Sequence, residues 1–275
     1  MVKQFSFLSV AIVFLTMPSV KGAGINLVDI FKNISYTQSS GAAPTSATGF
    51  FANVELTSAN PGDFNNVSVT YPGPGSPLSL PQISPTFFGS GPGFATQAAM
   101  NAAIPFGAYH YTATNTGVSV AATLNYTTDA FTSAVPALSS ATFSALQGLN
   151  PNMALTVGFN SFTPNAAASQ GLTFFTIFNS GGAVFSDGFL APGTTSLVLP
   201  GGTLAANTTY SFELDFSDRI NGTDPNGIPT LVGSDVRTDG TFTTGAAVVA
   251  TPEPGALLLV GGGLLLLGVI RKSNS

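Results

Sequence analysis

One stretch near the C-terminal end decides the fold: Tyr210-Ser211-Phe212-Glu213-Leu214-Asp215-Phe216. Its large apolar side chains recur at every second position, and polar side chains fill the positions between them. Successive side chains of a β-strand point to opposite faces of the sheet, so this stretch has one apolar face and one acidic face. Such alternation predicts a strand that packs one face on a core and leaves the other face polar.

Similar apolar runs lie on both sides of this strand, at a spacing of roughly ten residues, with Gly, Pro or Asn between them. In the second half of the chain, strands are expected at residues 153–159, 172–178, 184–190, 196–199 and 240–249. In the first half they are expected at residues 25–31, 49–56 and 64–71, with a hairpin at 106–126 and a short helix at 95–103. Short strands at this interval are typical of sandwiches. We therefore predict a mainly β protein with one or two antiparallel β-sandwich domains.

The approach to the decisive strand carries a more specific pattern. Leu204 lies six residues before Tyr210, which begins the strand. This arrangement resembles the tyrosine corner of immunoglobulin-like and fibronectin type III domains, in which the tyrosine hydroxyl bonds back to the backbone a few residues upstream. The resemblance implies an immunoglobulin-like sandwich in residues 133–250. A β-rich domain at residues 24–132 would precede it, since one strand-like run ends at Thr128 and a new one begins after Pro136.

The composition excludes several classes of protein. Only 7% of the 275 residues are charged, and seven Lys and Arg stand against twelve Asp and Glu. A nucleic-acid binder would need a basic patch, so no nucleic-acid partner is expected. The chain has no Cys, which removes disulfides and thiolate metal sites. Its 44% hydrophobic content is too high for a disordered chain.

Both ends of the chain predict passage into a membrane. Residues 1–23 have a short positive start, an apolar run and a small-residue exit, the order of a cleavable export signal. Residues 255–270 contain no polar side chain and are followed by Arg271 and Lys272. We predict a single transmembrane helix there, with the basic pair on the cytoplasmic side and everything before Pro252 exported.

The tail also resembles a known sorting signal. Pro252, Glu253 and Pro254 precede the apolar helix, and Arg271 and Lys272 follow it, as in the PEP-CTERM sorting signal of Gram-negative bacteria. The resemblance covers about 25 residues at the end of the chain. It implies export across the inner membrane, processing by an exosortase, and a final location at the cell surface or in the secreted matrix. Extracellular polysaccharide is the partner that such a location implies.

The acidic residues are the strongest candidates for a site in the exported region. Glu213 and Asp215 share one face of the decisive strand, and Asp218 and Asp224 lie in a segment, residues 218–227, that has the composition of a loop. Oxygen ligands of this kind suit calcium, although the spacing does not match an EF-hand. The alternatives are a solvated acidic face with ordinary turns, or paired carboxylates of a glycoside hydrolase at Glu213 and Asp215.

No enzymatic motif emerges elsewhere. The single histidine, His110, lies in the middle of an expected strand, and no phosphate-binding loop or zinc-protease motif occurs in the sequence. We therefore expect an exported structural or adhesive protein without catalysis. The alternative is a calcium- or glycan-binding module of the exopolysaccharide matrix.

Overall fold

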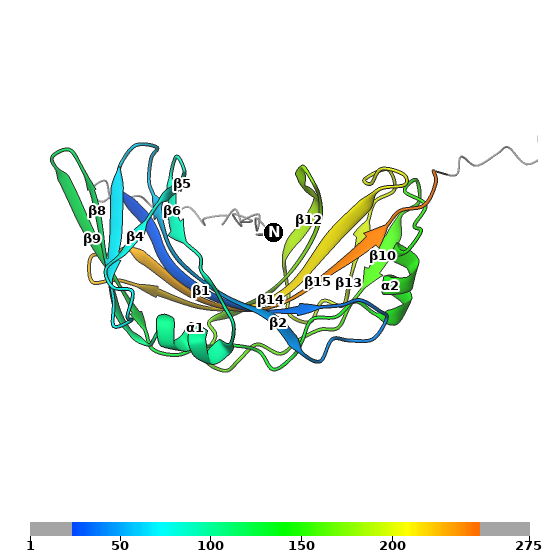
Figure 1. The fold of residues 1–275 in the computed structure, drawn as a ribbon, viewed down its shortest axis with the longest axis horizontal. Coiled ribbons are helices and arrows are strands. Elements are labelled where there is room, and N and C mark those ends of the chain that lie inside the picture. Colours follow the sequence, from blue (N-terminus) through cyan, green and yellow to red (C-terminus); the bar gives the residue numbers. More distant parts are fainter. Residues whose placement is uncertain (1–23, 248–275) are drawn as a thin grey trace, which may run out of the picture.

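A computed structural model describes residues 24–247 of the chain (Figure 1). The predicted export signal at residues 1–23 and the sorting tail at 251–275, with its apolar segment 255–270, lie outside the described residues. Fifteen strands and two short helices make up the described part, so the protein is mainly β, as the sequence predicts.

Most strands belong to one large sheet. Its order is β12-β11-β14-β15-β1-β2-β6-β5, with β7 also paired to β2. The strands are β1 (Ile25–Thr37), β2 (Ala47–Ser58), β5 (Gln82–Ser84), β6 (Phe87–Ser90), β7 (Gly93–Phe94), β11 (Gln170–Asn179), β12 (Gly182–Leu190), β14 (Thr209–Thr223) and β15 (Pro229–Thr243).

The large sheet is mixed, which corrects the prediction of purely antiparallel sheets. β1 pairs in parallel with β15 from Val28–Thr230 to Thr37–Asp239, while β1 and β2 are antiparallel. Parallel neighbours need a long connection, and here the connection is the whole chain between the first strand and the last. The alternation of side chains is the same in both kinds of sheet, so the sequence pattern did not distinguish them. The predicted boundary at residue 132 lies between β9 and α2, and the large sheet takes strands from both sides of it.

Two smaller sheets lie outside the curve of the large one (Figure 1). The first has the order β4-β3-β8-β9 and the second pairs β10 with β13. These elements are β3 (Asn66–Thr70), β4 (Leu78–Leu80), β8 (Gly107–Asn115), β9 (Val118–Tyr126), β10 (Leu155–Gly158), β13 (Ser196–Leu199), α1 (Gln97–Ala103) and α2 (Ser140–Leu146). The hairpin of β8 and β9 and the helix α1 occur where the sequence predicts them, whereas α2 was missed.

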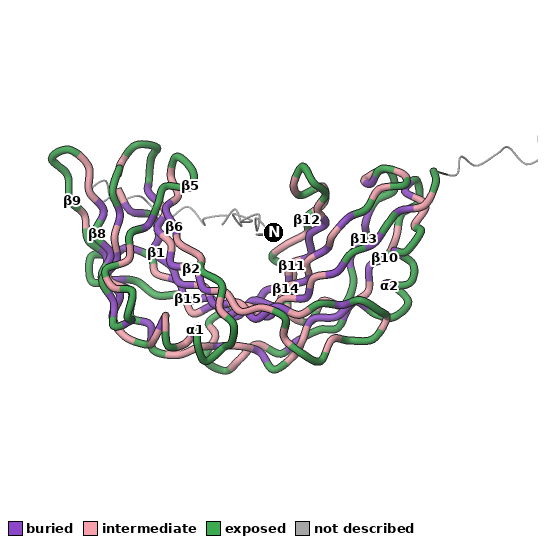
Figure 2. The backbone as a smooth tube through the Cα atoms, in the orientation of Figure 1, coloured by how far each residue is buried: buried purple, intermediate pink, exposed green. Residues whose placement is uncertain are grey.

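Each small sheet encloses a hydrophobic core against the large one (Figure 2). The first core joins Val28, Val54 and Leu56 of the large sheet to Tyr109 and Tyr111 of β8. The second joins side chains of β11 and β14 to β10, β13 and α2, and contains Phe175, Phe212, Leu214, Val157 and Leu199. The apolar positions of the decisive strand therefore face this second core, and its acidic positions face the concave side of the large sheet.

The predicted back-bond of the tyrosine corner is present. The Tyr210 hydroxyl accepts a hydrogen bond of 2.8 Å from the backbone N–H of Ala205, and Tyr210 itself is buried. Asn207, in the link between them, has a φ of 51° and turns the chain toward the strand. This confirms the geometry that the pattern around Leu204 and Tyr210 predicts.

Removing that hydroxyl tests how much the corner contributes. Tyr210→Phe keeps the ring against Phe242 but leaves the Ala205 N–H without its acceptor. We expect the free energy of unfolding to fall by about 1 kcal/mol, measured by urea denaturation. Tyr36→Phe, at a residue with no role in the corner, serves as the control. Equal stability of Tyr210→Phe and the wild-type protein would show that the bond does not stabilise the fold.

The segment at residues 218–227 differs from its prediction. β14 continues without a break to Thr223, and β15 begins at Pro229, so Asp218 and Arg219 are strand residues. The turn comprises only Asp224 to Ile228, where the N–H of Asp224 donates to the carbonyl of Ile228. Asp, Asn and Gly are frequent in turns, and their number in this segment concealed the end of a strand that pairs with β15 as far as Thr223.

Candidate functional site

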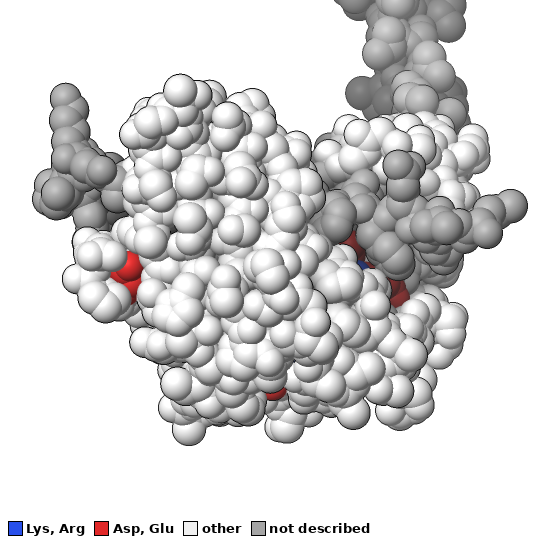
Figure 3. Space-filling model, turned by 60° about the vertical axis from the view of Figure 1, so that its left-hand side comes forward, with Lys and Arg blue, Asp and Glu red and all other residues white. Residues whose placement is uncertain are grey.

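The concave face of the large sheet carries most of the charge of the described residues. We call the following eight side chains the charged strip; they come from β1, β2, β14 and β15: Asp29, Glu55, Glu213, Asp215, Arg219, Asp235, Arg237 and Asp239. Elsewhere the surface has few charges, and the face in Figure 3 is almost free of them. A chain with so little charge thus gathers six carboxyl groups and two guanidinium groups in one place.

Arg237 is the centre of the strip on β15. It lies directly opposite Asp215 of β14. Its Nη1 lies 3.5 Å from Glu213 Oε1, and its Nε lies 3.1 Å from Asp239 Oδ1. Burial lowers the pKa of Arg237, but the carboxylates of Glu213 and Asp215 outweigh this effect and raise it above its ordinary value. Arg237 therefore stays charged and holds this end of the strip together.

Asp29 and Glu55 form the other end. They are directly opposite each other on the antiparallel strands β1 and β2, where two like charges would repel. Burial raises the pKa of Asp29 to about 7, and burial together with Asp29 raises the pKa of Glu55 to about 10. A negative charge on Asp29 therefore opposes ionisation of Glu55, and Glu55 keeps its proton to a higher pH than an exposed glutamate does.

Arg219 lies between these two ends. Its guanidinium is 5.3 Å from the ring centre of Phe174 and 5.8 Å from that of Phe31. Arg219, Gly233 and Phe31 are in register across β14, β15 and β1. Gly233 has no side chain, so the ring of Phe31 can lie flat across it; a Cβ at Gly233 would be 2.0 Å from Phe31 Cδ1. The arginine is thus held by two aromatic rings as well as by its acidic neighbours.

The remaining carboxyl groups of the strip resist ionisation. Burial raises the pKa of Asp215 well above its ordinary value, with a further contribution from Asp235. Burial also raises the pKa values of Glu213, Asp235 and Asp239. Within residues 24–247, no hydrogen-bond partner reaches Asp215 Oδ1 or Asp235 Oδ1. The strip therefore gathers carboxyl groups whose charged form is disfavoured by burial.

The structure does not bring the four predicted calcium ligands together. Glu213 and Asp215 lie on the concave face of β14, as their alternation predicts. Asp218 is an odd number of residues further along the same strand and faces the opposite side, where its Oδ2 accepts a 3.0 Å hydrogen bond from the Asn165 N–H. Burial raises the pKa of Asp218 to about 6.

Asp224 serves the turn between β14 and β15. Its Oδ1 accepts hydrogen bonds of 2.8 Å from the N–H groups of Asn226 and Ile228. Across residues 24–247, no three Asp, Glu or His side chains gather as a metal ion would require. Calcium binding at these four residues stays a prediction, because the described structure does not bring their side chains together.

A substitution separates the two roles of Asp224. We expect Asp224→Ala to lower the free energy of unfolding by about 1–3 kcal/mol in calcium-free buffer, because the Asn226 N–H and the buried Ile228 N–H lose their acceptor. Asp187→Ala, on the edge strand β12, is the matched control. Thermal denaturation with and without calcium measures both effects. A loss of stability that appears only when calcium is present would contradict the turn role.

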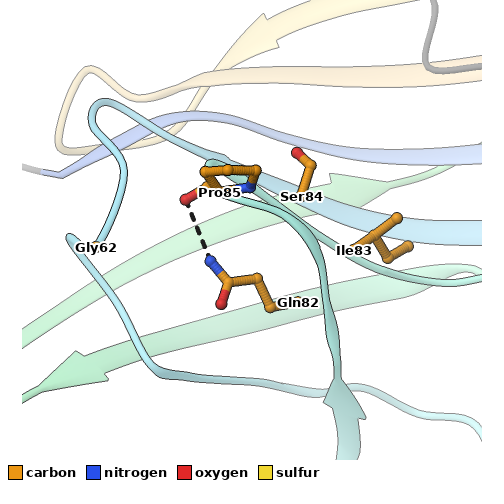
Figure 4. A pocket seen from close by; sticks show the side chains of 5 residues that line it. All are labelled: Gly62, Gln82, Ile83, Ser84 and Pro85. Carbon is orange, nitrogen blue, oxygen red and sulfur yellow. Dashed lines mark hydrogen bonds between the residues drawn. The ribbon is translucent and has the colours of Figure 1, made fainter.

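Two other features of the described residues, a histidine and a pocket, lie outside the charged strip. His110 is exposed on β8 and its Nδ1 lies 3.2 Å from Thr123 Oγ1. A pocket of about 390 Å³ lies at the sheet edge and is lined by Gly62, Gln82, Ile83, Ser84 and Pro85 (Figure 4). Gln82 Nε2 donates to the Pro85 carbonyl at 3.2 Å, and none of the five residues has an ionisable side chain.

The sequence pattern indicates only part of the strip. The alternation on one strand predicts that Glu213 and Asp215 share a face. Asp29, Glu55, Asp235 and Arg237 were missed as partners, because their proximity depends on the pairing of β1 with β2 and β15. Their alternation with buried neighbours, such as Val28 and Ile30 around Asp29, was the available signal.

No protein-family model and no curated protein matches the chain. Solved structures match it only distantly. The FN1-FN3 domains of chicken CNTN1 match at a TM-score of 0.26 and 13% identity, covering 82% of this chain and 69% of that one. A 1.5-MDa bacterial ice-binding adhesin matches at a TM-score of 0.24 and 15% identity, covering 82% of this chain and 66% of that one. The titin Ig tandem domains match at a TM-score of 0.20 and 13% identity, covering 79% of this chain and 95% of that one.

Among the described residues, neither helix has the length and apolar character that a membrane crossing needs.

Proposed function

We propose that the protein is an exported structural or adhesive component of a Gram-negative cell surface or secreted matrix, without catalytic activity. The tail carries this proposal: Pro252-Glu253-Pro254, an apolar segment at 255–270, and the basic pair Arg271-Lys272, in a chain that opens with an export signal. The described part supports it with a β-rich body whose outer surface has few charges. An exosortase would cut near the tripeptide and release the body from its temporary membrane anchor.

Processing of the full-length protein in an exosortase-containing host tests this proposal. The wild-type protein should appear outside the cell without peptides beyond about residue 254. Replacing Pro252, Glu253 and Pro254 with alanine should leave the uncut chain in the membrane fraction. Thr251→Ala, next to the tripeptide, is the matched control and should be processed normally. Secreted protein that still contains Arg271 would contradict the proposal.

Glycan binding in the matrix is a second candidate function, favoured by the charged strip. The side chains of Glu213 and Asp239 in the strip are 23% and 36% exposed, so a ligand can reach their carboxyl groups. Carboxyl groups of this kind are suited to hydroxyl-rich ligands, because they form strong hydrogen bonds with them. A polysaccharide that binds here should raise the melting temperature of the wild-type protein. It should raise that of Asp239→Asn less, and that of Asp187→Asn as much as the wild type.

A further inference from the structure

Lys32 is buried in an unusual place for a lysine. It lies on β1 between Ile30 and Ile34, on the face of the strand that packs against the first core, and only 1% of it is exposed. It is the only lysine among residues 24–247. A buried ammonium group needs partners, because the loss of water disfavours its charged form.

Two side chains from distant parts of the chain meet the Lys32 amine. Its Nζ donates a 2.9 Å hydrogen bond to the carboxamide oxygen Oδ1 of Asn101 on α1. It also lies 3.4 Å from Oδ1 and 3.5 Å from Oδ2 of Asp129. The carbonyl carbon of Asn101 is one bond beyond the oxygen that the amine contacts. A nucleophile, an acyl carbon and a carboxyl group that can move protons therefore share one site.

Two aromatic rings, a tyrosine hydroxyl and the helix α1 surround and position the groups of this site. The rings of Tyr126 and Phe106 lie 4.8 Å and 5.4 Å from Lys32 Nζ. The Tyr126 hydroxyl donates to Asp129 Oδ1 and so orients the carboxyl group. Asn101 is positioned by its helix, because the neighbouring Met100 is fully buried and Thr96 caps the first turn. Burial lowers the pKa of Lys32, although Asp129 opposes this, and a lower pKa favours the neutral amine that can act as a nucleophile.

We propose that Lys32 and Asn101 form an intramolecular isopeptide bond, with Asp129 as the group that transfers the protons. Asp129 first takes a proton from the Lys32 ammonium. The neutral Nζ then attacks Cγ of Asn101, and a bond forms between them. Asp129 passes that proton to Nδ2 and takes a second proton from Nζ. The Cγ–Nδ2 bond breaks, and ammonia leaves.

The protons balance in this step. Of the three on the original ammonium, one stays on the new amide, one leaves with the ammonia and one remains on Asp129. No oxidant, metal or other reactant is needed. The reaction is an acyl transfer from one nitrogen to another, and positioning of the reacting groups is the main requirement.

The bond would tie β1 to α1 across a sequence separation of 69 residues. It would supply a covalent constraint in a chain that has no Cys and hence no disulfide. A link that encloses a long loop restricts the unfolded chain, which favours the folded state. This inference goes beyond the proposed function and does not depend on where the protein is finally located.

Mass spectrometry of the folded full-length protein tests the proposal. A chymotryptic digest should contain one branched peptide with Lys32 joined to Asn101, lighter than the two separate peptides together by one ammonia, about 17 Da. Recovery of both residues only in separate, unmodified peptides would overturn the proposal. A link from Lys32 to Asp129, with loss of water, would overturn the assignment of Asn101 as the acceptor.

Variants assign the roles of the individual groups. Asn101→Ala removes the acyl carbon and should abolish the link, whereas Gln97→Ala, on the exposed side of the same helix, should keep it. Asp129→Asn retains a side chain of the same shape but cannot accept the proton, so the link should form at least about 100-fold more slowly. Circular dichroism verifies that each variant is folded. Linkage in folded Asp129→Asn at the wild-type rate would show that Asp129 does not transfer the proton.

Discussion

Gly233→Val is expected to lower the free energy of unfolding by about 3 kcal/mol or more, the upper end of the range for a side chain forced into a packed site. A Cβ at Gly233 would lie 2.0 Å from Cδ1 and 2.2 Å from Cε1 of Phe31, so the whole ring would have to move. Phe31 cannot move without cost, because it lies against the guanidinium of Arg219. The position is also central, since β15 pairs with β14 on one side and β1 on the other.

Urea denaturation followed by circular dichroism measures the loss. The matched control is Gly193→Val, because a Cβ at Gly193 meets no atom within 4 Å and the residue is exposed. We expect a single transition in both proteins, since β1, β14 and β15 belong to one sheet that takes strands from both halves of the chain. Equal stability of the two variants would contradict the close packing of Phe31 on Gly233.

The sequence was a good guide to individual strands. The alternation in residues 210–216 correctly predicted which face of β14 is buried, and the pattern around Leu204 and Tyr210 correctly predicted the hydrogen bond to the Ala205 N–H. Both features are recorded in patterns that are local in the sequence. Local periodicity records the burial of each side chain, and burial is the same whichever strand lies alongside.

Pairing between distant strands was not predictable in this way. The parallel contact of β1 with β15 joins residues about two hundred positions apart, and no local pattern indicates it. The length of β14 was underestimated for a related reason. Residues 217–223 contain Asp, Arg, Asn and Gly, which alone favour a turn, but pairing with β15 as far as Thr223 holds them extended. Local preference is a weak constraint when a neighbouring strand satisfies the backbone of these residues.

The candidate sites illustrate the same limit. The charged strip and the cluster around Lys32 both draw residues from separate elements, and Lys32 and Asn101 are on a strand and a helix. Glu213, Asp215, Asp218 and Asp224 form one candidate group in the sequence because they are close in the chain. The strand geometry separates them, since Asp218 has the opposite orientation and Asp224 belongs to the turn.

The paired carboxyl groups of Asp29 and Glu55 predict that the stability of the protein falls as the pH rises. Their pKa values in the folded protein are about 7 and about 10, above their ordinary values of 3.8 and 4.5. The folded protein therefore holds protons that the unfolded chain has released. Their contribution to stability is complete below about pH 4, and it is lost as the pH rises through the two folded pKa values. The charged groups that act on the pair are Arg219, which favours ionisation of Asp29, and Asp235, which opposes that of Glu55.

Glu55→Gln removes the titrating group and supplies an N–H donor for Asp29. We expect the variant to be more stable than the wild-type protein between pH 6 and pH 9. The difference in free energy of unfolding should grow by about 1.4 kcal/mol for each pH unit over which the folded wild-type protein holds one proton that its unfolded chain has released. Urea denaturation at a series of pH values measures this difference. Asn53→Ser, on the same face of β2 but without a change of charge, should follow the wild-type profile. Parallel profiles for Glu55→Gln and the wild-type protein would show that burial and Asp29 do not raise the pKa of Glu55 in the folded protein.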